Sequence, residues 1–412
     1  MMDRMLNPYG MMMLNPSHIV WSFLSKYFYI ILIVCVATIA ISTLFYKAKH
    51  KLAHQFWYKQ PVNFIKDNNS SIKIIDLINP KSTKWTNYKN ISFHSLYDED
   101  LSFDDIQTFI QHNYIHGSDC MYAPQHLAEY FKGHNHPIYV GIYKDKTSLV
   151  EKNHSEMIGC VSAYPLNIKA KNSQLKYVYY VDNLCVKLDK RGKNIAPQMI
   201  DTLHHHFRHN NDATKVSLFK REGHLSGYIV PLVCYDTSLY YIDNWFSKEF
   251  IMHASSNVLD ITKQNINVLY NFLYNATNMD LLIFPELSNL ECLIEAKQLF
   301  IKLLMIDNEV GSMYIFRDSN TLYGQTKCVE CIASINNQKN MAFFVNGFYH
   351  VLKELYTKYN FKILQMEKLS HNVKLDNAIR KKWSSFTTLP VSWFFYNYIY
   401  PEQPPGNILI LT

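Results

Sequence analysis

The chain has 412 residues and is mildly basic, with a formal net charge of +7 and a pI of about 8.7. This charge suits an anionic ligand or a membrane surface, but it is below the level typical of nucleic-acid-binding proteins, and the basic residues are scattered. The length is sufficient for two domains or one large two-lobed domain, and aromatic residues make up 15% of the chain. We therefore expect a protein with a sizeable aromatic core and no nucleic-acid partner.

The first feature along the chain is a segment without charged side chains, residues 27–46. As a helix it would be about 30 Å long, which matches the hydrocarbon core of a bilayer. A lysine-rich stretch, 47–66, follows it, and the positive-inside rule then places the large C-terminal part in the cytosol. The alternatives are a buried core helix and a cleaved signal peptide, although the segment starts late for a signal. We expect a tail over residues 1–26 and a single transmembrane helix over 27–46.

An aromatic motif follows, Gln55-Phe-Trp-Tyr-Lys-Gln-Pro-Val62. The pair Phe56 and Trp57 stands before an extended segment that ends in proline. Such a pair is able to stack on a nucleotide base or to anchor the first turn of a core, and the residues alone leave both interpretations open.

The central stretch of the chain, residues 177–198, is predicted to form a strand, a basic turn and the start of a helix. Val178, Val181 and Val186 belong to a buried apolar strand. Asp182 and Asn183 interrupt this strand, and polar residues at such a place indicate a β-bulge, which releases backbone amides from the ladder.

The basic turn consists of Lys190, Arg191, Gly192 and Lys193, and Asn194 then caps a helix that begins at residue 195. Free amides at a helix start next to three cations suit a pyrophosphate group. A solvated turn between a strand and a helix is the alternative interpretation.

Residues 263–412 repeat the alternation of helices and strands, which favours an α/β unit used twice. The last seven residues, 406–412, are an apolar strand that would draw the terminal carboxylate of Thr412 into the protein; an ordinary last strand is the alternative. The patterns predict helices over 96–131, 264–276, 289–304 and 347–359, and strands over 281–285, 312–317, 341–346, 393–400 and 408–411.

Cysteines and histidines give weak signals. The eight cysteines are spread over the whole length, which does not suggest a disulfide framework. Cys328 and Cys331 form a single CxxC pair, which is better explained by a strand than by a zinc site. The histidines at 204–206 and 209 are predicted to lie on the solvent face of the helix that follows the basic turn. We expect no metal site.

Several of these stretches resemble glycylpeptide N-tetradecanoyltransferases (N-myristoyltransferases). Residues 191–196 fit Arg-x-x-(Gly/Asn)-x-Ala, which resembles the acyl-CoA loop of GNAT acyltransferases. Residues 55–62 resemble the family's Gln-Phe-Trp-x-x-Gln-Pro-Val segment, and Asn183-Leu-Cys-Val186 with Ala196-Pro197 resembles its central strand and helix. The resemblance implies an α/β fold of two GNAT-like halves, each a mixed twisted sheet flanked by helices. An acyl-CoA-binding half would cover 47–262 and a peptide-binding half 263–412.

The resemblance also implies the ligands and the reaction. A long-chain acyl group, myristoyl, would pass from acyl-CoA, a co-substrate, to the N-terminal glycine amine of a protein, and the enzyme would be a monomer without a permanent cofactor. The Thr412 carboxylate would be the base, and the backbone amides of Asn183 and Leu184 would bind the oxyanion. The residues implied in binding the coenzyme are Gln55, Phe56, Trp57, Asn183, Leu184, Cys185, Val186, Arg191, Gly192, Lys193, Asn194, Ile195 and Ala196.

Some residues depart from the family pattern. The family's Asn-Phe before the oxyanion position is Asp182-Asn183 here, an acidic loop keeps only Asp119, and a glycine-rich turn is replaced by residues 384–390. Two alternatives therefore stay open: a catalytically degenerate, membrane-anchored protein that binds acyl-CoA or a partner, and a GNAT-type acetyltransferase acting on a small amine. Cys185 as an acyl-accepting nucleophile is a further alternative, but no paired histidine is evident.

Overall fold

The computed structural model describes residues 16–53, 55–65, 71–115, 119–145, 156–171, 173–211, 214–225, 228–247, 252, 254–275 and 279–412. Within the first helix, side chains are described for residues 26–49, 51 and 52. The chain forms two compact units, residues 1–60 and residues 61–412, which are described separately.

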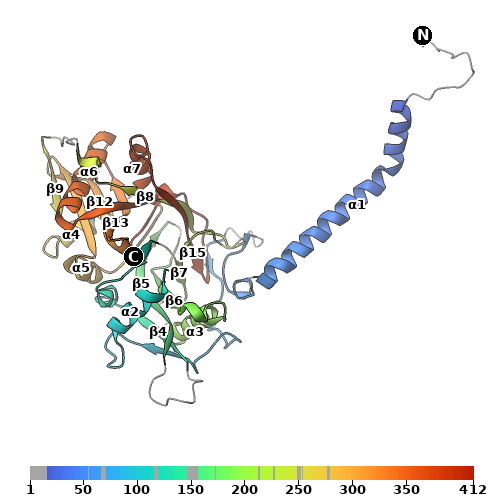
Figure 1. Cartoon of the computed structure of the whole chain (residues 1–412), viewed down its shortest axis with the longest axis horizontal. Coiled ribbons are helices and arrows are strands. Elements are labelled where there is room, and N and C mark those ends of the chain that lie inside the picture. Colours follow the sequence, from blue (N-terminus) through green and yellow to red (C-terminus); the bar gives the residue numbers. More distant parts are fainter. Residues whose placement is uncertain are drawn as a thin grey trace, which may run out of the picture. The chain divides into compact units, whose positions relative to one another are not determined.

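The N-terminal unit contains one long helix, α1 (Pro16–Ala53), which Figure 1 shows in blue. Within it, Lys26–Lys49 has a mean hydropathy of 2.6, so this stretch is long and apolar enough to cross a membrane. None of this window is buried, and its large apolar side chains are exposed, as in Ile33 and Phe45. The predicted segment 27–46 is therefore helical, and its exposure differs from that of a helix packed in a protein core.

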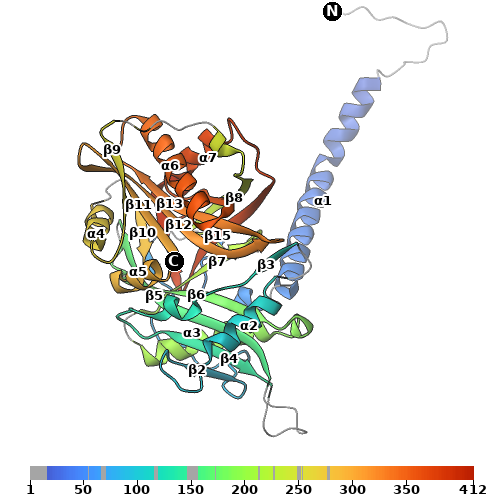
Figure 2. The same ribbon diagram turned by 60° about the vertical axis from the view of Figure 1, so that its left-hand side comes forward.

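The main unit begins with a mixed sheet built from consecutive elements of the chain. Four strands pair antiparallel in the order β2-β4-β5-β6, and α3 then leads to β7, which lies parallel to β6. Helices α2 and α3 lie against these strands (Figure 2). The bounds are β2 (Ile91–His94), α2 (Phe103–Asn113), β4 (Tyr139–Lys144), β5 (Met157–Ala170), β6 (Tyr177–Val186), α3 (Ile195–Asn210) and β7 (Ser217–Glu222).

The second part of the main unit repeats this plan. Three strands pair antiparallel in the order β11-β12-β13, with β9 beside β11, and α6 then leads to β14, which is parallel to β13. The predicted α/β unit therefore occurs twice. The bounds are β9 (Ser256–Asp260), β11 (Leu299–Ile306), β12 (Glu309–Tyr323), β13 (Thr326–Asn336), α6 (Met341–Tyr359) and β14 (Phe361–Glu367).

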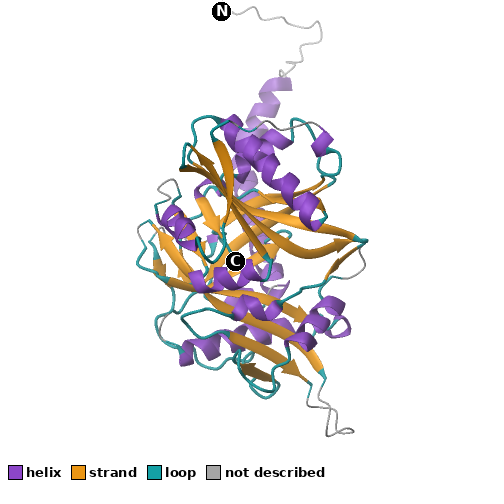
Figure 3. Ribbon diagram, turned by 90° about the vertical axis from the view of Figure 1, so that its left-hand side faces the viewer, coloured by secondary structure: helices purple, strands orange, loops and turns teal. Residues whose placement is uncertain are grey.

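The two repeats share one continuous sheet. Strands β8 (Val233–Tyr241) and β15 (Thr387–Tyr396) connect β14 to β7, while β10 (Leu281–Phe284) and β17 (Ile408–Ile410) extend the sheet beyond β5. Strands from the second part of the chain therefore complete the sheet of the first part. The chain end lies in the middle of the main unit, among strands of both repeats (Figures 1, 2 and 3).

Short elements complete the main unit. Strand β3 pairs with β12, and β1 pairs with β16 in a separate two-stranded sheet. Their bounds are β1 (Lys73–Ile74), β3 (Cys120–Tyr122), η3 (Leu127–Phe131), η4 (Leu188–Lys190), η5 (Trp245–Ser247), α4 (Ile266–Tyr274), α5 (Leu287–Glu295), α7 (Asn372–Ile379), β16 (Tyr398–Ile399) and η6 (Pro405–Asn407).

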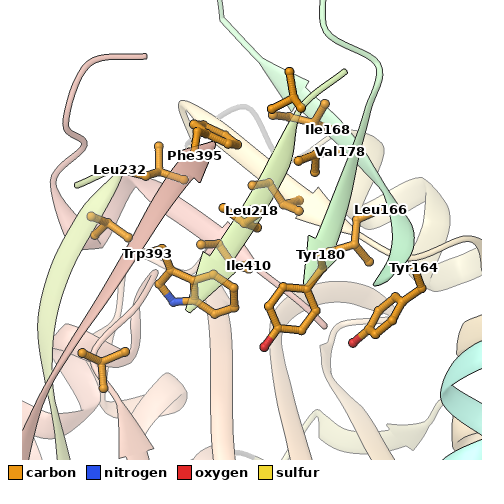
Figure 4. Packing of buried hydrophobic residues seen from close by; sticks show 14 of the residues in the cluster. Tyr164, Leu166, Ile168, Val178, Tyr180, Leu218, Leu232, Trp393, Phe395 and Ile410 are labelled. Atoms are coloured by element: carbon orange, nitrogen blue, oxygen red, sulfur yellow. The ribbon is translucent and has the colours of Figure 1, made fainter. Parts of the chain in front are cut away.

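Apolar side chains from strands far apart in the sequence meet in one core. Figure 4 shows Tyr164 and Leu166 from β5, Val178 and Tyr180 from β6, and Trp393 from β15 within it. The ring centroids of Tyr180 and Trp393 are 5.4 Å apart. This packing fixes β6, the strand that carries the central stretch, between its neighbours.

Four expectations about local structure are wrong. Residues 289–304 are not one helix, because α5 ends at Glu295 and β11 begins at Leu299. Residues 341–346 begin α6, where the Asn340 side chain accepts a hydrogen bond from the Ala342 amide and caps the helix. Within 96–131, the long helix is limited to α2. A short apolar run without turn residues fits both the helical and the strand periodicity, and packing in the folded protein decides which of the two forms.

The fourth error concerns His204 of α3, whereas His209 is exposed as expected and His205 and His206 are partly exposed. His204 is buried, with 6% of its surface exposed, and its ring lies 4.5 Å from the ring of Tyr396. Arg208, one turn later, is also buried and donates hydrogen bonds to the carbonyls of Asp76 and Ile78. The segment before β2 therefore covers a face of α3 that the sequence pattern assigned to solvent.

Candidate active site

The central strand β6 contains a β-bulge at the predicted place. Cys160 pairs with Cys185 and Ser162 pairs with Asp182, so one residue of β5 lies opposite two residues of β6, Asn183 and Leu184. Asn183 has a φ of 53°, in the left-handed region that asparagine tolerates well. Its side chain donates to the Ser162 hydroxyl at 2.9 Å, which holds the bulge in place.

The two amides of the bulge have different surroundings. The Asn183 N–H donates to Oδ1 of Asp182 at 2.8 Å, so the side chain that precedes the bulge accepts this bond. Leu184 is not in register with β5, and the pairing of β6 with β7 ends at Val181. The two strands separate beyond this point, and the bulge lies where they do so.

A cavity of about 500 Å³ lies beside the bulge and the basic turn. Most of the residues predicted to bind a coenzyme line it, and Asn183, Cys185 and Lys193 are the predicted residues of this stretch outside its lining. Tyr114, Lys190 and Pro197 complete the wall. The lining is Tyr114, Leu184, Val186, Lys190, Arg191, Gly192, Asn194, Ile195, Ala196 and Pro197.

The start of α3 faces this cavity with free backbone donors. Asn194 occupies the N-cap position with a φ of 60°, but its side chain makes no capping hydrogen bond. The first amides of a helix have no partner within the helix, and here the cap leaves them to a ligand. Lys190 and Gly192, with a φ of 77°, lie on the same wall. The arrangement suits a phosphate group.

Arg191 has a different role from the one expected of a phosphate ligand. Its Nε donates to the carbonyl of Val186 at 3.2 Å, and its Nη2 donates to the carbonyls of Asn113 and Tyr114. These last two carbonyls belong to the C-terminal end of α2, where a cation is favourable. Arg191 therefore ties the basic turn to α2, whereas the Lys190 ammonium has neither a hydrogen bond nor an ion pair among the described residues.

A second cavity, of about 460 Å³, also lies beside the bulge, where β6 and β7 separate. Leu184 and Tyr114 line both cavities. The wall is aromatic and charged: Tyr122, Tyr130, Tyr180 and Phe219 stand beside Asp182, Lys220, Glu222, Arg317, Asp318 and Glu330. We call it the charged cavity.

A buried charge network forms the floor of the charged cavity. Arg317 Nη2 contacts Glu330 Oε2 at 2.6 Å, and Lys220 lies between Glu330 and Glu367. Burial alone would raise the pKa of Glu330, but Arg317 and Lys220 hold it well below its ordinary value. Burial raises the pKa of Glu367 to about 7, although Lys220 opposes the change.

The chain end is buried beside this network, as the sequence predicted. Thr412 is 4% exposed, and its terminal oxygen accepts a hydrogen bond from Arg317 Nη1 at 3.0 Å. The Leu411 amide donates to the carbonyl of Ile283, which fixes the end of β17 against β10. Arg317 thus binds two anions, the Glu330 carboxylate and the chain terminus.

Sequence reasoning did not find the charged residues of this cavity. Lys220, Arg317, Glu330 and Glu367 come from β7, β12, β13 and β14, and they are separate in the sequence. The one local signal is a charged residue within an otherwise apolar strand, as for Glu330 between Val329 and Cys331. A buried charge requires a partner, so this pattern indicates a charge network without naming its other members.

Three predicted residues belong to the N-terminal unit. Gln55, Phe56 and Trp57 lie at the start of η1 (Trp57–Lys59), where the rings of Phe56 and Trp57 meet edge-on at 5.1 Å. These residues belong to a different compact unit from the cavity, and their contact with a coenzyme is a prediction.

The cysteines of the two central strands are placed as core residues. Cys185 is 2% exposed and pairs with Cys160 across the strands. Cys328 and Cys331 are both buried in β13, as expected for residues of a strand. The described residues contain no group of three or more side chains suited to hold a metal ion.

Comparisons with known proteins agree with this geometry. Residues 71–215 match the family model described as the N-terminal domain of myristoyl-CoA:protein N-myristoyltransferase. This part of the chain is similar to the N-terminal domain of N-myristoyltransferases. The match includes α2, β4, β5, the bulged strand β6, the basic turn and α3, and so it covers the cavity beside the basic turn. No curated protein sequence matches the chain.

Solved structures extend the likeness to the whole main unit. Saccharomyces cerevisiae N-myristoyltransferase with bound myristoyl-CoA shares the fold at a TM-score of 0.66 and 14% identity, over 87% of this chain and 99% of that chain. The same enzyme with myristoyl-CoA and inhibitors gives a TM-score of 0.64 at 13% identity, over 88% and 96%. At these identities the likeness establishes the fold, and it includes both repeats of the N-myristoyltransferase plan.

Proposed function

We propose that the protein is an acyltransferase that moves the myristoyl group of myristoyl-CoA to the N-terminal glycine amine of a protein substrate. The family match over residues 71–215 and the fold support this function. The observation that carries it is the bulge at Asn183 and Leu184, which lies between a cavity suited to phosphate and a charged cavity. Two substrates bound in the two cavities would meet there.

In this proposal the coenzyme occupies the cavity beside the basic turn. Its pyrophosphate accepts hydrogen bonds from the first amides of α3 and from Lys190, while Leu184 and Val186 contact its apolar arm. Arg191 holds the turn in position through the end of α2. The bound thioester then reaches the bulge, where the strand offers backbone amides outside the ladder.

The amine substrate enters the charged cavity and attacks the thioester carbonyl. The negative charge that develops on the carbonyl oxygen needs hydrogen-bond donors, and the amides of Asn183 and Leu184 supply them in this proposal. The amine must first lose a proton, since an α-ammonium has a pKa of about 7.7–8.0. The Thr412 carboxylate is the base that the family resemblance implies, and its pairing with Arg317 weakens it as a proton acceptor.

The activity is tested with the full-length chain in detergent. Myristoyl-CoA and glycine-initiated peptides are expected to give free CoA together with the acylated peptide, as identified by mass spectrometry. Matched peptides that begin with N-acetylglycine are expected to give none. Release of CoA from acetyl-CoA alone would indicate a small-amine acetyltransferase, and tight binding of myristoyl-CoA without release would indicate a degenerate protein.

We also propose that α1 crosses a membrane once and that residues 61–412 lie in the cytosol. The exposed apolar surface of Lys26–Lys49 supports the first part, because water does not favour such a surface. The lysines at 47, 49 and 51 support the orientation. In intact cells, protease added outside should leave the main unit whole, and its digestion there would contradict the orientation.

A further inference from the structure

The carboxylate of Asp182 lies beside the bulge and has one oxygen available to bind a substrate. It is the last residue of β6 before the bulge, and it lines the charged cavity. Its Oδ1 accepts the Asn183 amide at 2.8 Å. Its Oδ2 has no hydrogen-bond partner among the described residues, and the carboxylate is thus half satisfied.

Several aromatic side chains line the same cavity as this carboxylate. Tyr114, Tyr122, Tyr130 and Tyr180 line the same cavity and come from four different segments of the chain. Tyrosine rings beside an anion form a favourable site for an organic cation, since the ring faces are negative. No apolar group would satisfy the carboxylate in this enclosure.

A nearby hydroxyl also lacks a partner. Tyr164 is 1% exposed, and its hydroxyl makes no hydrogen bond among the described residues. Tyr164 pairs with Tyr180 across β5 and β6, and Figure 4 shows both hydroxyls pointing in the same direction. Tyr180 precedes Asp182 by two residues on β6 and lines the same cavity, and burial and the negative charge of Asp182 raise the pKa of both phenols. A ligand with several N–H donors would complete these groups.

Of the other carboxylates that line the cavity, Glu330 is paired with a cation, whereas Asp318 accepts the Asn320 amide and Glu222 is exposed. Arg317 binds Glu330 and the terminal oxygen of Thr412, and Lys220 binds Glu367. These pairs stabilise the ionised carboxylates and reduce their tendency to accept a proton. The charges of Arg317 and Lys220 lower the pKa of Asp182, and the charge of Glu222 raises it. Asp182 itself makes no ion pair among the described residues.

We propose that Asp182 binds the α-ammonium group of the amine substrate and accepts its proton, in place of the Thr412 carboxylate. This assignment rests on the proposed function of the site. The ammonium sits between Oδ2 of Asp182 and the tyrosine side chains, next to the bulge where the thioester would lie. Burial raises the pKa of Asp182 and makes it a better base than an exposed aspartate, although the Asn183 amide, Arg317 and Lys220 oppose this change.

The step balances without another reagent. The ammonium passes one proton to Oδ2 of Asp182, and the nitrogen lone pair forms the C–N bond with the thioester carbonyl carbon. The tetrahedral intermediate loses a second proton from nitrogen to the departing sulfur, so the C–S bond breaks and CoA leaves as the thiol. Asp182 then returns its proton to solvent. A protonated carboxyl is a weaker acceptor, and the Asn183 amide is therefore released toward the oxyanion as the oxyanion forms.

The test compares Asp182→Asn with the wild-type full-length chain. The substitution keeps an oxygen for the Asn183 amide and removes the proton acceptor, so we expect kcat to fall by about 10² to 10⁴ while myristoyl-CoA affinity is unchanged. This deficit should shrink by about tenfold between pH 7 and 9, because the free amine fraction rises there. A structural role alone would not produce this recovery with pH.

The matched control is Asp201→Asn on α3. Asp201 is a buried carboxylate that accepts bonds from the Thr83 and Thr86 hydroxyls, and it lines neither cavity. This variant should keep the wild-type rate. Wild-type turnover by Asp182→Asn, or a deficit that is the same at every pH, would overturn the assignment and return the role to Thr412.

A wild-type chain without transfer activity would instead overturn the proposed function. The ammonium site is then measured directly, by calorimetry with a glycine-initiated peptide and its N-acetylated form on the myristoyl-CoA-loaded chain. We expect wild type to prefer the free amine by at least tenfold and Asp182→Asn to lose this preference. Equal binding of both peptides to wild type would reject the site.

Discussion

At the scale of single residues, the site depends on buried polar groups whose charge is set by their neighbours. Asn183 adopts a left-handed φ, donates its side chain to Ser162 and donates its amide to Asp182. One residue therefore fixes the bulge in three ways. The carboxylate of Asp182, which precedes it, has one oxygen without a partner among the described residues. Glu330 and Glu367, in contrast, are paired with cations.

His371 offers a test of how burial controls charge. It is 8% exposed, and its Nδ1 accepts the Asn336 amide at 2.8 Å. Burial, aided by Lys374, lowers the pKa of His371 to about 4. Below pH 6.5 the unfolded chain takes up a proton that the folded chain accepts only near pH 4, so this group contributes stability above pH 6.5 and loses it as the pH falls.

We predict that His371→Asn weakens this dependence. The asparagine oxygen can replace Nδ1 as the acceptor, and it does not titrate. Between pH 7 and 4 the free energy of unfolding should fall by up to about 3 kcal/mol more in wild type than in the variant. Urea unfolding of the two proteins at both pH values measures this difference, and equal pH dependence would show that His371 is already charged when folded.

At the scale of elements, the sequence predicted the central β–turn–α segment well. The bulge, the basic turn and the start of α3 lie where local residue types place them, because turn and strand signals are local, although the Asn194 side chain does not make the expected cap. The charged cavity was not predicted, since its walls come from β3, η3, β6, β7, β12 and β13. Such a site depends on the order of the strands in the sheet. Strands that pair although they are more than a hundred residues apart leave no local pattern in the sequence.

The basic turn contains two cations that we predict to act differently. Lys190→Ala removes a charge from the coenzyme cavity, so the Kd for myristoyl-CoA should rise about tenfold or more while Tm is unchanged. Arg191→Ala removes donors to Val186, Asn113 and Tyr114, so Tm should fall as well.

Calorimetry and thermal unfolding separate these two effects. The exposed Lys176, which lines neither cavity, is the control, and Lys176→Ala should change neither quantity. Unaltered affinity in Lys190→Ala would show that the phosphates bind elsewhere.

The last strand allows another prediction at this scale. Leu411 and Thr412 are buried, and the terminal oxygen contacts Arg317. A short tag after Thr412 must displace this contact, so we expect both a lower Tm and the loss of acyl transfer. The same tag before Met1 should have no effect. A C-terminally tagged protein with wild-type Tm and turnover would show that the buried chain end is dispensable.

At the scale of the whole molecule, two copies of a β–α–β plan share one sheet, and their strands exchange across it. Strands β10 and β15 come from the second part of the chain and pair with β5 and β7 of the first, and β17 pairs with β10 at the edge of the sheet. The sequence predicted the repeated unit from its alternating pattern, but this exchange could not be predicted, because short apolar strands such as 281–284 and 408–410 fit many partners. The exchange is what brings the chain end to the middle of the main unit.

Arg317 holds this arrangement together, since it joins β12, β13 and the terminus of the chain. Arg317→Met would leave the buried terminal carboxylate without its cation and the Glu330 carboxylate with only Lys220, at 3.7 Å. We predict a loss of about 3–5 kcal/mol in the free energy of unfolding, as measured by urea titration. The double variant Arg317→Met with Glu330→Gln should recover part of the loss, and a single variant as stable as wild type would contradict this role.

The central claim is that the acyl donor lies across the bulge of β6, with its phosphates at the start of α3 and its thioester facing the charged cavity. The most direct measurement is an experimental structure of the full-length chain with a non-hydrolysable myristoyl-CoA analogue. The account predicts the pyrophosphate within hydrogen-bonding distance of Lys190 and the first amides of α3, and the thioester carbonyl beside the amides of Asn183 and Leu184. A pyrophosphate bound away from the basic turn, or a carbonyl far from the bulge, would contradict it.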